Sequence, residues 1–254
     1  MVITDTSTAS LLSNIYSSNA SALSSSLSKL ASGKRVQSAG DDFAAYIRAA
    51  GLNTDIATYQ NTRQDLQEVK GATDYAVGVG NAVLEDLSRL KELQDLYTAA
   101  AGDADKEAAY GAEYDAIVAR VTDTIANSAY DGTTVYGTTS IGAAGTIDVT
   151  ATNAADSGNL TAGGVDGTDD IDAELVEAQA FVAQMSSFQT AITREMNLND
   201  TIIAGKEATV SALINVDEVK ELANVTNLQV RQQATVSMMS QANVSNAALA
   251  RLFA

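Results

Sequence analysis

Apolar residues recur along most of this chain at alternating steps of three and four, the spacing of a helix face that packs on another helix. Near the start of the chain the pattern consists of Leu11, Leu12, Ile15, Tyr16, Ala20, Leu23, Leu27 and Leu30. Gly33 follows it, and glycine commonly ends a helix because it accepts a left-handed backbone. Ser38, Asp41 and Asp42 precede the next apolar run and are typical helix-starting residues. The pattern therefore predicts one helix that ends near Gly33 and a second that starts near Asp42.

The longest patterns lie in the middle of the chain. One is sustained from Leu66 to Tyr97, with Gly80 and other small residues at its centre, so neighbouring helices can approach closely there. A second extends from Ile171 to Leu213. A shorter helix between them is predicted from the stripe Tyr114, Ile117, Val118, Val121 and Ile125.

Residues 130–170 differ from the rest because they are rich in Gly, Thr and Asp and contain short alternations of apolar and polar residues. This composition predicts one or two small β-hairpins with loops. Beyond the second long pattern, apolar residues continue toward the C-terminus at Val219, Leu222, Val225, Leu228, Met238, Met239, Ala242, Leu249 and Leu252. The chain should therefore end, as it begins, in a helix with an apolar stripe.

These elements predict a mainly α fold. We expect a long antiparallel helical bundle or coiled-coil rod, with a small β-hairpin region at its tip and the terminal helices paired at the other end. Residues 1–35 and 215–254 would form a terminal coiled-coil domain. Residues 36–214 would form a helical bundle domain that carries the β tip at about residues 130–170.

The composition is distinguished by the residue types that it lacks. The 254 residues include no His, Cys, Pro or Trp. The absence of proline favours long uninterrupted helices. Without Cys there is no disulfide or thiolate chemistry, and without His a zinc site would need carboxylates alone and the commonest general base is missing. We therefore expect a chain that is not an enzyme and that uses no metal and no cofactor.

Charge is distributed unevenly along the chain. The formal net charge is −17, which argues against nucleic acid and anionic membrane surfaces as partners. All but one of the 32 acidic residues lie between positions 36 and 221, and the exception is Asp5. Carboxylates are costly in a dry, crowded interface, so the two ends, which are nearly free of acids, are expected to be buried against matching partners.

The chain shows no recognisable targeting or membrane-spanning segment. The opening residues lack the cationic and apolar regions of a secretory signal peptide. No apolar run reaches the roughly 18 residues needed to span a bilayer. We expect a protein that is soluble when made and, if exported, leaves the cell by another route.

Three motifs, in order and at the corresponding ends of the chain, make the sequence resemble bacterial flagellin. They are "LASGKRVQSAGDDFAA" at 30–45, "IANSAYDGTTV" at 125–135 and "QQATVSMMSQANVSNAALARLF" at 232–253. The positions that match the family signature are Arg35, Ser38, Asp41, Asp42, Gln232, Gln233, Gln241 and Asn243. Phe43 stands where the family usually has a small residue, and the short Gly/Thr-rich segment replaces the large variable outer domains.

The resemblance implies a structural subunit of the flagellar filament that self-assembles through its terminal helices. In flagellins these helices line an inner tube and the central helices form an outer tube. The positions expected to pack in this way are Leu12, Tyr16, Leu23, Leu27, Leu30, Leu222, Val225, Leu228, Met238, Met239, Leu249 and Leu252. The implied partners are further copies of the chain, flagellar cap and hook-junction proteins, an export chaperone and the type III export apparatus. The implied location is the extracellular filament.

The sequence is also compatible with other functional interpretations. A hook–filament junction protein shares both terminal patterns, and a coiled-coil secreted effector is a more distant alternative. A flagellin that carries a metalloprotease would need His, which this chain lacks. The segment "LSRLKELQDL" at 87–96 resembles the face by which some flagellins engage a Toll-like receptor. The matching positions are Arg89, Leu93 and Glu113, although Arg89 could simply pair with a nearby glutamate on a solvated face.

Two weaker patterns have structural alternatives. The acidic run at 166–172 could suggest calcium, but it lacks the ligand spacing of an EF-hand loop and is better interpreted as helix capping. The Thr/Ser-rich tip would be a suitable surface for O-glycosylation.

Overall fold

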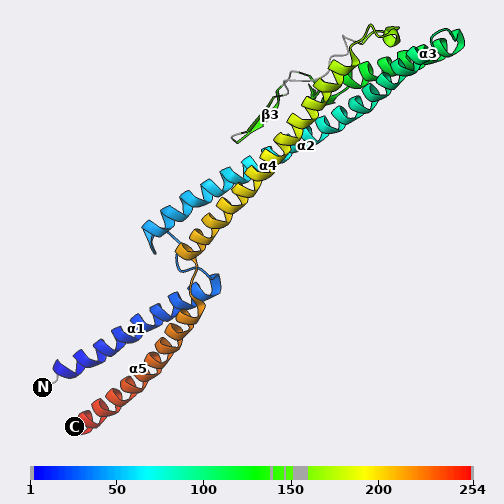
Figure 1. The fold of residues 1–254 in the computed structure, drawn as a ribbon. Helices are drawn as coiled ribbons and strands as arrows, with labels where there is room; N and C mark the ends of the chain where they lie inside the picture. Colours follow the sequence, from blue (N-terminus) through cyan, green and yellow to red (C-terminus); the bar gives the residue numbers. More distant parts are fainter. Residues whose placement is uncertain (1–2, 138–139, 146, 151–159, 253–254) are drawn as a thin grey trace. The chain divides into compact units, whose positions relative to one another are not determined.

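The computed structural model describes residues 3–137, 140–145, 147–150 and 160–252, and their side chains except at positions 3–9, 148, 246 and 248–252. The long helices are α1 (Ile3–Ser32), α2 (Phe43–Ala99), α3 (Ala104–Ala126), α4 (Ile171–Ile214) and α5 (Glu218–Leu252). The predicted mainly helical fold is confirmed (Figure 1).

The chain divides into two compact units. One comprises residues 1–56 with 204–254, and the other comprises residues 57–203. Helices α2 and α4 contribute to both units, because the divisions fall within these helices. The predicted boundaries after residues 35 and 214 fall instead at the two connectors between helices. We refer below to the terminal unit and the central unit.

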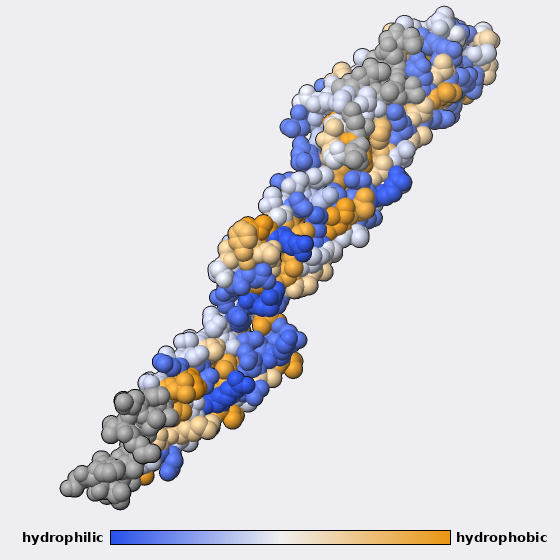
Figure 2. All heavy atoms as spheres, turned by 90° about the vertical axis from the view of Figure 1, so that its left-hand side faces the viewer, coloured by the Kyte–Doolittle hydropathy of each residue, from blue (hydrophilic) through white to orange (hydrophobic). Residues whose placement is uncertain are grey.

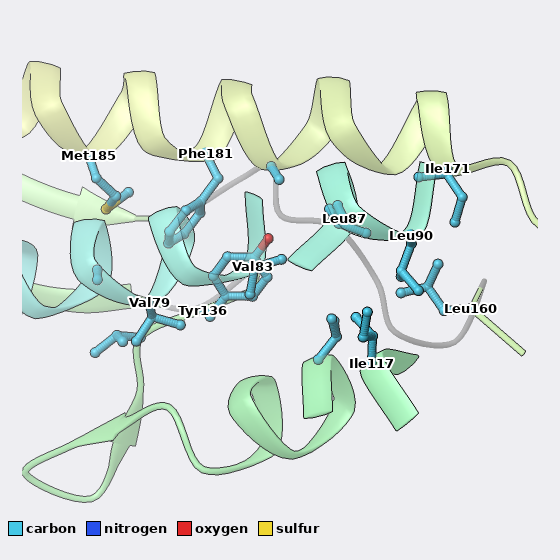
Figure 3. Packing of buried hydrophobic residues seen from close by; sticks show 14 of the residues in the cluster. Val79, Val83, Leu87, Leu90, Ile117, Tyr136, Leu160, Ile171, Phe181 and Met185 are labelled. Carbon is cyan, nitrogen blue, oxygen red and sulfur yellow. The ribbon is translucent and has the colours of Figure 1, made fainter. Parts of the chain in front are cut away.

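The central unit is built from α2, α3 and α4 around one hydrophobic core. The predicted seam on α2 is confirmed, since its positions are buried at Leu66, Val69, Thr73, Ala76, Gly80, Val83, Leu87, Leu90 and Gln94. Figure 3 shows Phe181 and Met185 pointing from α4 toward α2, with Ile117 of α3 packed below. The ring of Phe181 lies 4.5 Å from that of Tyr136, centroid to centroid.

Helices α2 and α4 approach closely at Gly80. A Cβ atom added there would lie 2.6 Å from Val182 Cγ2 and 3.0 Å from Phe181 Cδ1. Glycine is therefore needed at this position for the helices to pack at their present distance. Gly78, two residues earlier on the same helix, has open space around it.

Two small antiparallel hairpins follow α3, as the sequence predicts. The first joins β1 (Ala129–Tyr130) to β2 (Thr133–Thr134) through a turn in which Asp131 has φ +47° and Gly132 has φ +77°. The second joins β3 (Ser140–Ala144) to β4 (Ile147–Thr150), with a register shift near the start of β3. Ala144 and Val149 bring this hairpin into the core.

A buried polar cluster fixes the segment before α4, which includes the short 3-10 helix η2 (Gly164–Asp166). The Asp169 carboxylate accepts hydrogen bonds from the Tyr114 hydroxyl at 2.7 Å and from the Thr161 amide and hydroxyl at 2.9 and 2.8 Å. A side chain at Gly164 would overlap this carboxylate. Burial, aided by the bond to Asp169, raises the pKa of Tyr114 above its ordinary value.

The terminal unit contains α1, α5, the first turns of α2 and the last turns of α4. Figure 1 shows α1 and α5 side by side and antiparallel. Gly33, at φ +68°, ends α1 as predicted. None of the described helices combines the length and the hydropathy needed to cross a membrane.

Candidate assembly surfaces on the terminal helices

The contact between α1 and α5 is narrow and partly polar. On α1, Ser26 is buried, whereas Leu12, Leu23 and Leu30 are only half-buried. Among the described side chains of α5, Val225, Leu228 and Thr235 are buried. The Asn224 side-chain amide donates a hydrogen bond of 3.0 Å to the hydroxyl oxygen of Ser26. The two helices therefore hold each other by a thin seam that leaves much apolar surface uncovered.

Exposed hydrophobic side chains line both helices beside this seam. On α1 they are Leu11, Ile15, Tyr16 and Leu27. On α5 they are Val219, Leu222, Val230, Val236, Met238 and Val244. Figure 2 shows hydrophobic side chains at the surface of this unit in the lower part of the view. A water-facing apolar surface of this extent is typical of an interaction site.

An open groove of about 520 Å³ lies between the middle of α1 and the C-terminal half of α5. Tyr16 of α1 forms one side, and the α5 side is formed by Val236, Met239, Ser240, Asn243, Val244 and Ala247. The lining is mainly apolar and carries no charged side chain. Met239 is half-buried and Met238 is 60% exposed, so the adjacent methionines occupy different environments.

The two connectors of the terminal unit pair with each other through backbone hydrogen bonds. The Arg35 amide donates to the Ile214 carbonyl at 2.6 Å, and the Val216 amide donates to the Gly33 carbonyl at 3.0 Å. Val36, beside this ladder, is 2% exposed. The segment that follows α1 is thus fixed to the segment that leads into α5.

Arg35 adds a side-chain clamp to this junction. Its guanidinium donates a hydrogen bond of 2.8 Å to the carbonyl oxygen of Leu213 and lies 3.5 Å from the Asp42 carboxylate. A cation is favourable at the carbonyl end of α4, where the helix dipole is negative. Asp42 in turn caps α2 by accepting a hydrogen bond of 3.0 Å from the Ala45 amide.

Asp41 folds the short loop between the junction and α2. Its carboxylate accepts hydrogen bonds from the Ser38 amide at 2.8 Å, the Gln37 amide at 3.0 Å and the Ser38 hydroxyl at 3.1 Å. These bonds lower the pKa of Asp41, the amides of Ser38 and Gln37 having the largest effect. Of the predicted helix-starting residues, Asp42 caps the helix while Ser38 and Asp41 shape the loop.

The remaining signature positions lie on α5. Gln232 is half-buried, and Gln233, Gln241 and Asn243 are exposed. Leu249 and Leu252 lie outside the residues whose side chains are described. The proposed role of all these positions in assembly stays a prediction.

The positions proposed for receptor contact lie on the central unit. Arg89 donates hydrogen bonds of 2.7 Å to Glu92 and of 2.7 and 3.0 Å to Glu113. Leu93 is fully buried in the core, so its side chain is not accessible from the surface of this unit. The polar part of the predicted face is therefore a network of ion pairs between α2 and α3.

The acidic run before α4 is occupied by structural hydrogen bonds. Asp170 caps α4 by accepting a bond of 3.1 Å from the Ala173 amide, and Asp166 accepts one of 3.1 Å from the Thr168 amide. Asp169 belongs to the buried cluster with Tyr114. Within the described ranges, no group of three His, Cys, Asp or Glu side chains is arranged to hold a metal ion.

Sequence reasoning missed the polar seam residues Ser26, Asn224 and Thr235. Ser26 stands next to Leu27 in the predicted stripe, and the helix turns Ser26 rather than Leu27 toward α5.

The chain is similar to known proteins over most of its length. A family profile described as the bacterial flagellin N-terminal helical region matches residues 2–140, more than half of the chain. Flagellin FljM of Caulobacter vibrioides is 25% identical over 264 aligned positions, covering 95% of this chain and 94% of the relative. Flagellin FljO of the same species is 24% identical over 253 positions, covering 89% and 88%.

Proposed function

The chain belongs to the bacterial flagellin family, and we propose that it is the repeating structural subunit of a flagellar filament used for swimming. In this proposal the terminal helices of many copies pack into a continuous inner wall and the central unit forms the outer layer. The protein acts outside the cell and has no catalytic role. The names of two relatives, both flagellins, support this assignment.

The exposed apolar surface of the terminal helices, whose only acids are Asp5, Glu218 and Glu221, carries the proposal. Leu11, Ile15, Val230 and Met238 face water in the single chain, at exposures of 41–61%. Burying a side chain of this kind contributes about 1.5–3 kcal/mol at most, so several such contacts per subunit can drive assembly. Burial in the polymer would supply the packing that the thin seam between α1 and α5 does not.

The central unit has a supporting role in this proposal. Its core is closed by α2, α3 and α4, and ion pairs such as Arg120–Asp86 and Lys91–Asp172 join these helices at the surface. It is suited to transmit force as a rigid body, because close packing gives an interior of low compressibility.

Further partners follow from the same proposal. Flagellar cap and hook-junction proteins would contact the ends of the filament, and an export chaperone with the type III export apparatus would carry the chain out. A Toll-like receptor is a further proposed partner, through Arg89 and Glu113. Because Leu93 is buried, its part in such a contact would be to support the helix surface from below.

The alternative is a hook–filament junction protein, which would use the same terminal helices for a bounded assembly. The two roles are separated by seeded growth. A filament subunit extends short seeds of its own polymer into long filaments, while a junction protein adds few copies and stops.

An introduced charge tests the proposed surface directly. Val230→Glu places a carboxylate on the exposed α5 face, and Val176→Glu does so at a similarly exposed site, 65% against 61%, in the central unit. We expect Val230→Glu to abolish polymer recovered by sedimentation from seeded solutions and Val176→Glu to retain it. Equal polymer from both variants would exclude burial of the α5 face in assembly.

A further inference from the structure

The first turns of α2 carry an exposed apolar face. Phe43, Tyr46 and Ile47 are 68%, 40% and 52% exposed, and their spacing places them on one side of the helix. The opposite side is buried through Ala45 and Ala49. This part of α2 is therefore apolar on two sides, although only one of them is covered in the terminal unit.

A second exposed apolar pair lies at the start of α5. Val219 is 81% exposed and Leu222, one turn later, is 58% exposed. The same helix buries Val225 and Leu228 against the rest of the terminal unit. Because both patches remain open to water in the same unit, they do not cover each other within one chain.

The charges beside the two patches are complementary. Arg48 flanks the α2 face and makes no ion pair with any described residue. Glu218 flanks the α5 pair, one turn before Leu222, and likewise has no ion-pair partner in the described parts of the chain. Residues 43–54 contain no acid, and of the two acids that precede them Asp42 is paired with Arg35. Around Glu218, Asp217 and Glu221 outnumber Lys220, so this segment keeps a negative charge.

We propose that the α2 face formed by Phe43, Tyr46 and Ile47 docks on the start of α5 in a second copy of the chain, with Arg48 of one copy paired to Glu218 of the other. The inference rests on the proposed self-assembly and names one of its contacts. Two different, complementary patches on one chain give a head-to-tail contact. When such a contact does not close into a ring, its repetition builds an open helical polymer.

The apolar part of the contact is tested by Phe43→Ala, with Val176→Ala as a control at a similarly exposed position in the central unit. The readout is the critical concentration for seeded polymerisation of the full chain. Loss of a buried Phe should raise this concentration roughly tenfold or more, and the control should change it by less than about twofold. Equal critical concentrations for Phe43→Ala and the unaltered chain would overturn the proposal.

The charged part is tested by exchange. Arg48→Glu and Glu218→Arg should each raise the critical concentration. The double variant should have a critical concentration between that of the single variants and that of the unaltered chain, because it restores the ion pair with reversed polarity. A double variant worse than either single variant would contradict the pairing. Circular dichroism of each monomer establishes that the exposed substitutions leave the helices formed.

The outcomes separate the two levels of the account. If the unaltered chain fails to extend seeds, the proposed filament function is wrong and this contact falls with it. If the unaltered chain polymerises and Phe43→Ala does so equally well, only the docking contact is wrong.

Discussion

The guanidinium of Arg35 donates a hydrogen bond of 2.8 Å to the carbonyl oxygen of Leu213, in the last turn of α4. These residues are far apart in the sequence, and the bond joins the connector after α1 to the end of α4. It is reinforced by backbone bonds between Arg35 and Ile214 and between Gly33 and Val216. A signature position of the family thus has a structural explanation: it holds the two crossing segments of the terminal unit together.

We expect Arg35→Ala to loosen this junction. Loss of a charged hydrogen bond to a carbonyl costs about 1 kcal/mol at a partly exposed site, so the Val216 amide should exchange its hydrogen several-fold faster. Arg63→Ala is the control, because its ion pair with Asp200 at 3.1 Å is exposed and should contribute little. Unchanged exchange at Val216 in Arg35→Ala would show that the backbone ladder alone holds the junction.

Gly80→Ala should destabilise the central unit. Its new methyl group would press on Val182 and Phe181, and overpacking of a core typically costs about 1–3 kcal/mol. Gly78→Ala is a matched control on the same helix, where open space allows alanine to stabilise the helix by up to about 1 kcal/mol. Thermal unfolding monitored by circular dichroism measures both. If Gly80→Ala lowered the unfolding temperature no more than Gly78→Ala does, α2 and α4 would not be as close as described.

Stability should fall at alkaline pH because of Tyr114. Burial, with the hydrogen bond to Asp169, raises the pKa of Tyr114 in the folded chain, while the unfolded chain loses the proton near the ordinary value of 10.0. The contribution of Tyr114 to the free energy of unfolding is therefore complete below pH 10 and declines as the pH rises further. Tyr114→Phe should remove this part of the pH dependence. Denaturant unfolding at pH 8 and at pH 11 compares the two chains.

Tyr114→Phe should also lower the stability of the folded chain at neutral pH. Tyr114→Phe leaves the buried Asp169 carboxylate without one donor, which should cost about 1–3 kcal/mol. Tyr110→Phe is the control, because the Tyr110 hydroxyl has no hydrogen-bond partner among the described residues. If Tyr114→Phe left the free energy of unfolding unchanged at neutral pH, the Tyr114 hydroxyl would be in contact with water and not bound to Asp169.

Asn224→Ala should weaken the seam between α1 and α5. It leaves the buried Ser26 hydroxyl without its donor, at a cost of about 1 kcal/mol. Gln233→Ala, at an exposed site on the same helix, should have little effect. Amide exchange along α1 distinguishes the two, and equal protection in both variants would argue against a specific role for this polar contact.

Much of the fold could be predicted from the spacing of apolar residues. The seam from Leu66 to Gln94 is buried as the pattern requires, and α4 extends over Ile171–Ile214, close to the predicted range. Gly33 and Asp42 mark helix ends because their backbone and capping chemistry is local. Local signals of this kind are present in the sequence itself.

The rest depends on contacts between distant parts of the chain. The periodicity places Leu27 on the apolar stripe but cannot decide whether Leu27 or the adjacent Ser26 faces α5. In the structure Ser26 is buried and Leu27 is exposed. The pairing of Gly33 with Val216 uses backbone groups that every residue carries, so the sequence holds no mark of it. The burial of Leu93 depends on α2, α3 and α4 packing together.

In the proposed filament the exposed apolar faces of the terminal helices are covered by neighbouring copies of the chain. A helical reconstruction by electron cryomicroscopy, from polymer grown with the full chain, tests it most directly. We predict that Leu11, Ile15, Val230 and Met238 each lie within about 4.5 Å of apolar side chains from another subunit. A polymer joined through the central units alone, with α1 and α5 facing solvent, would contradict the account.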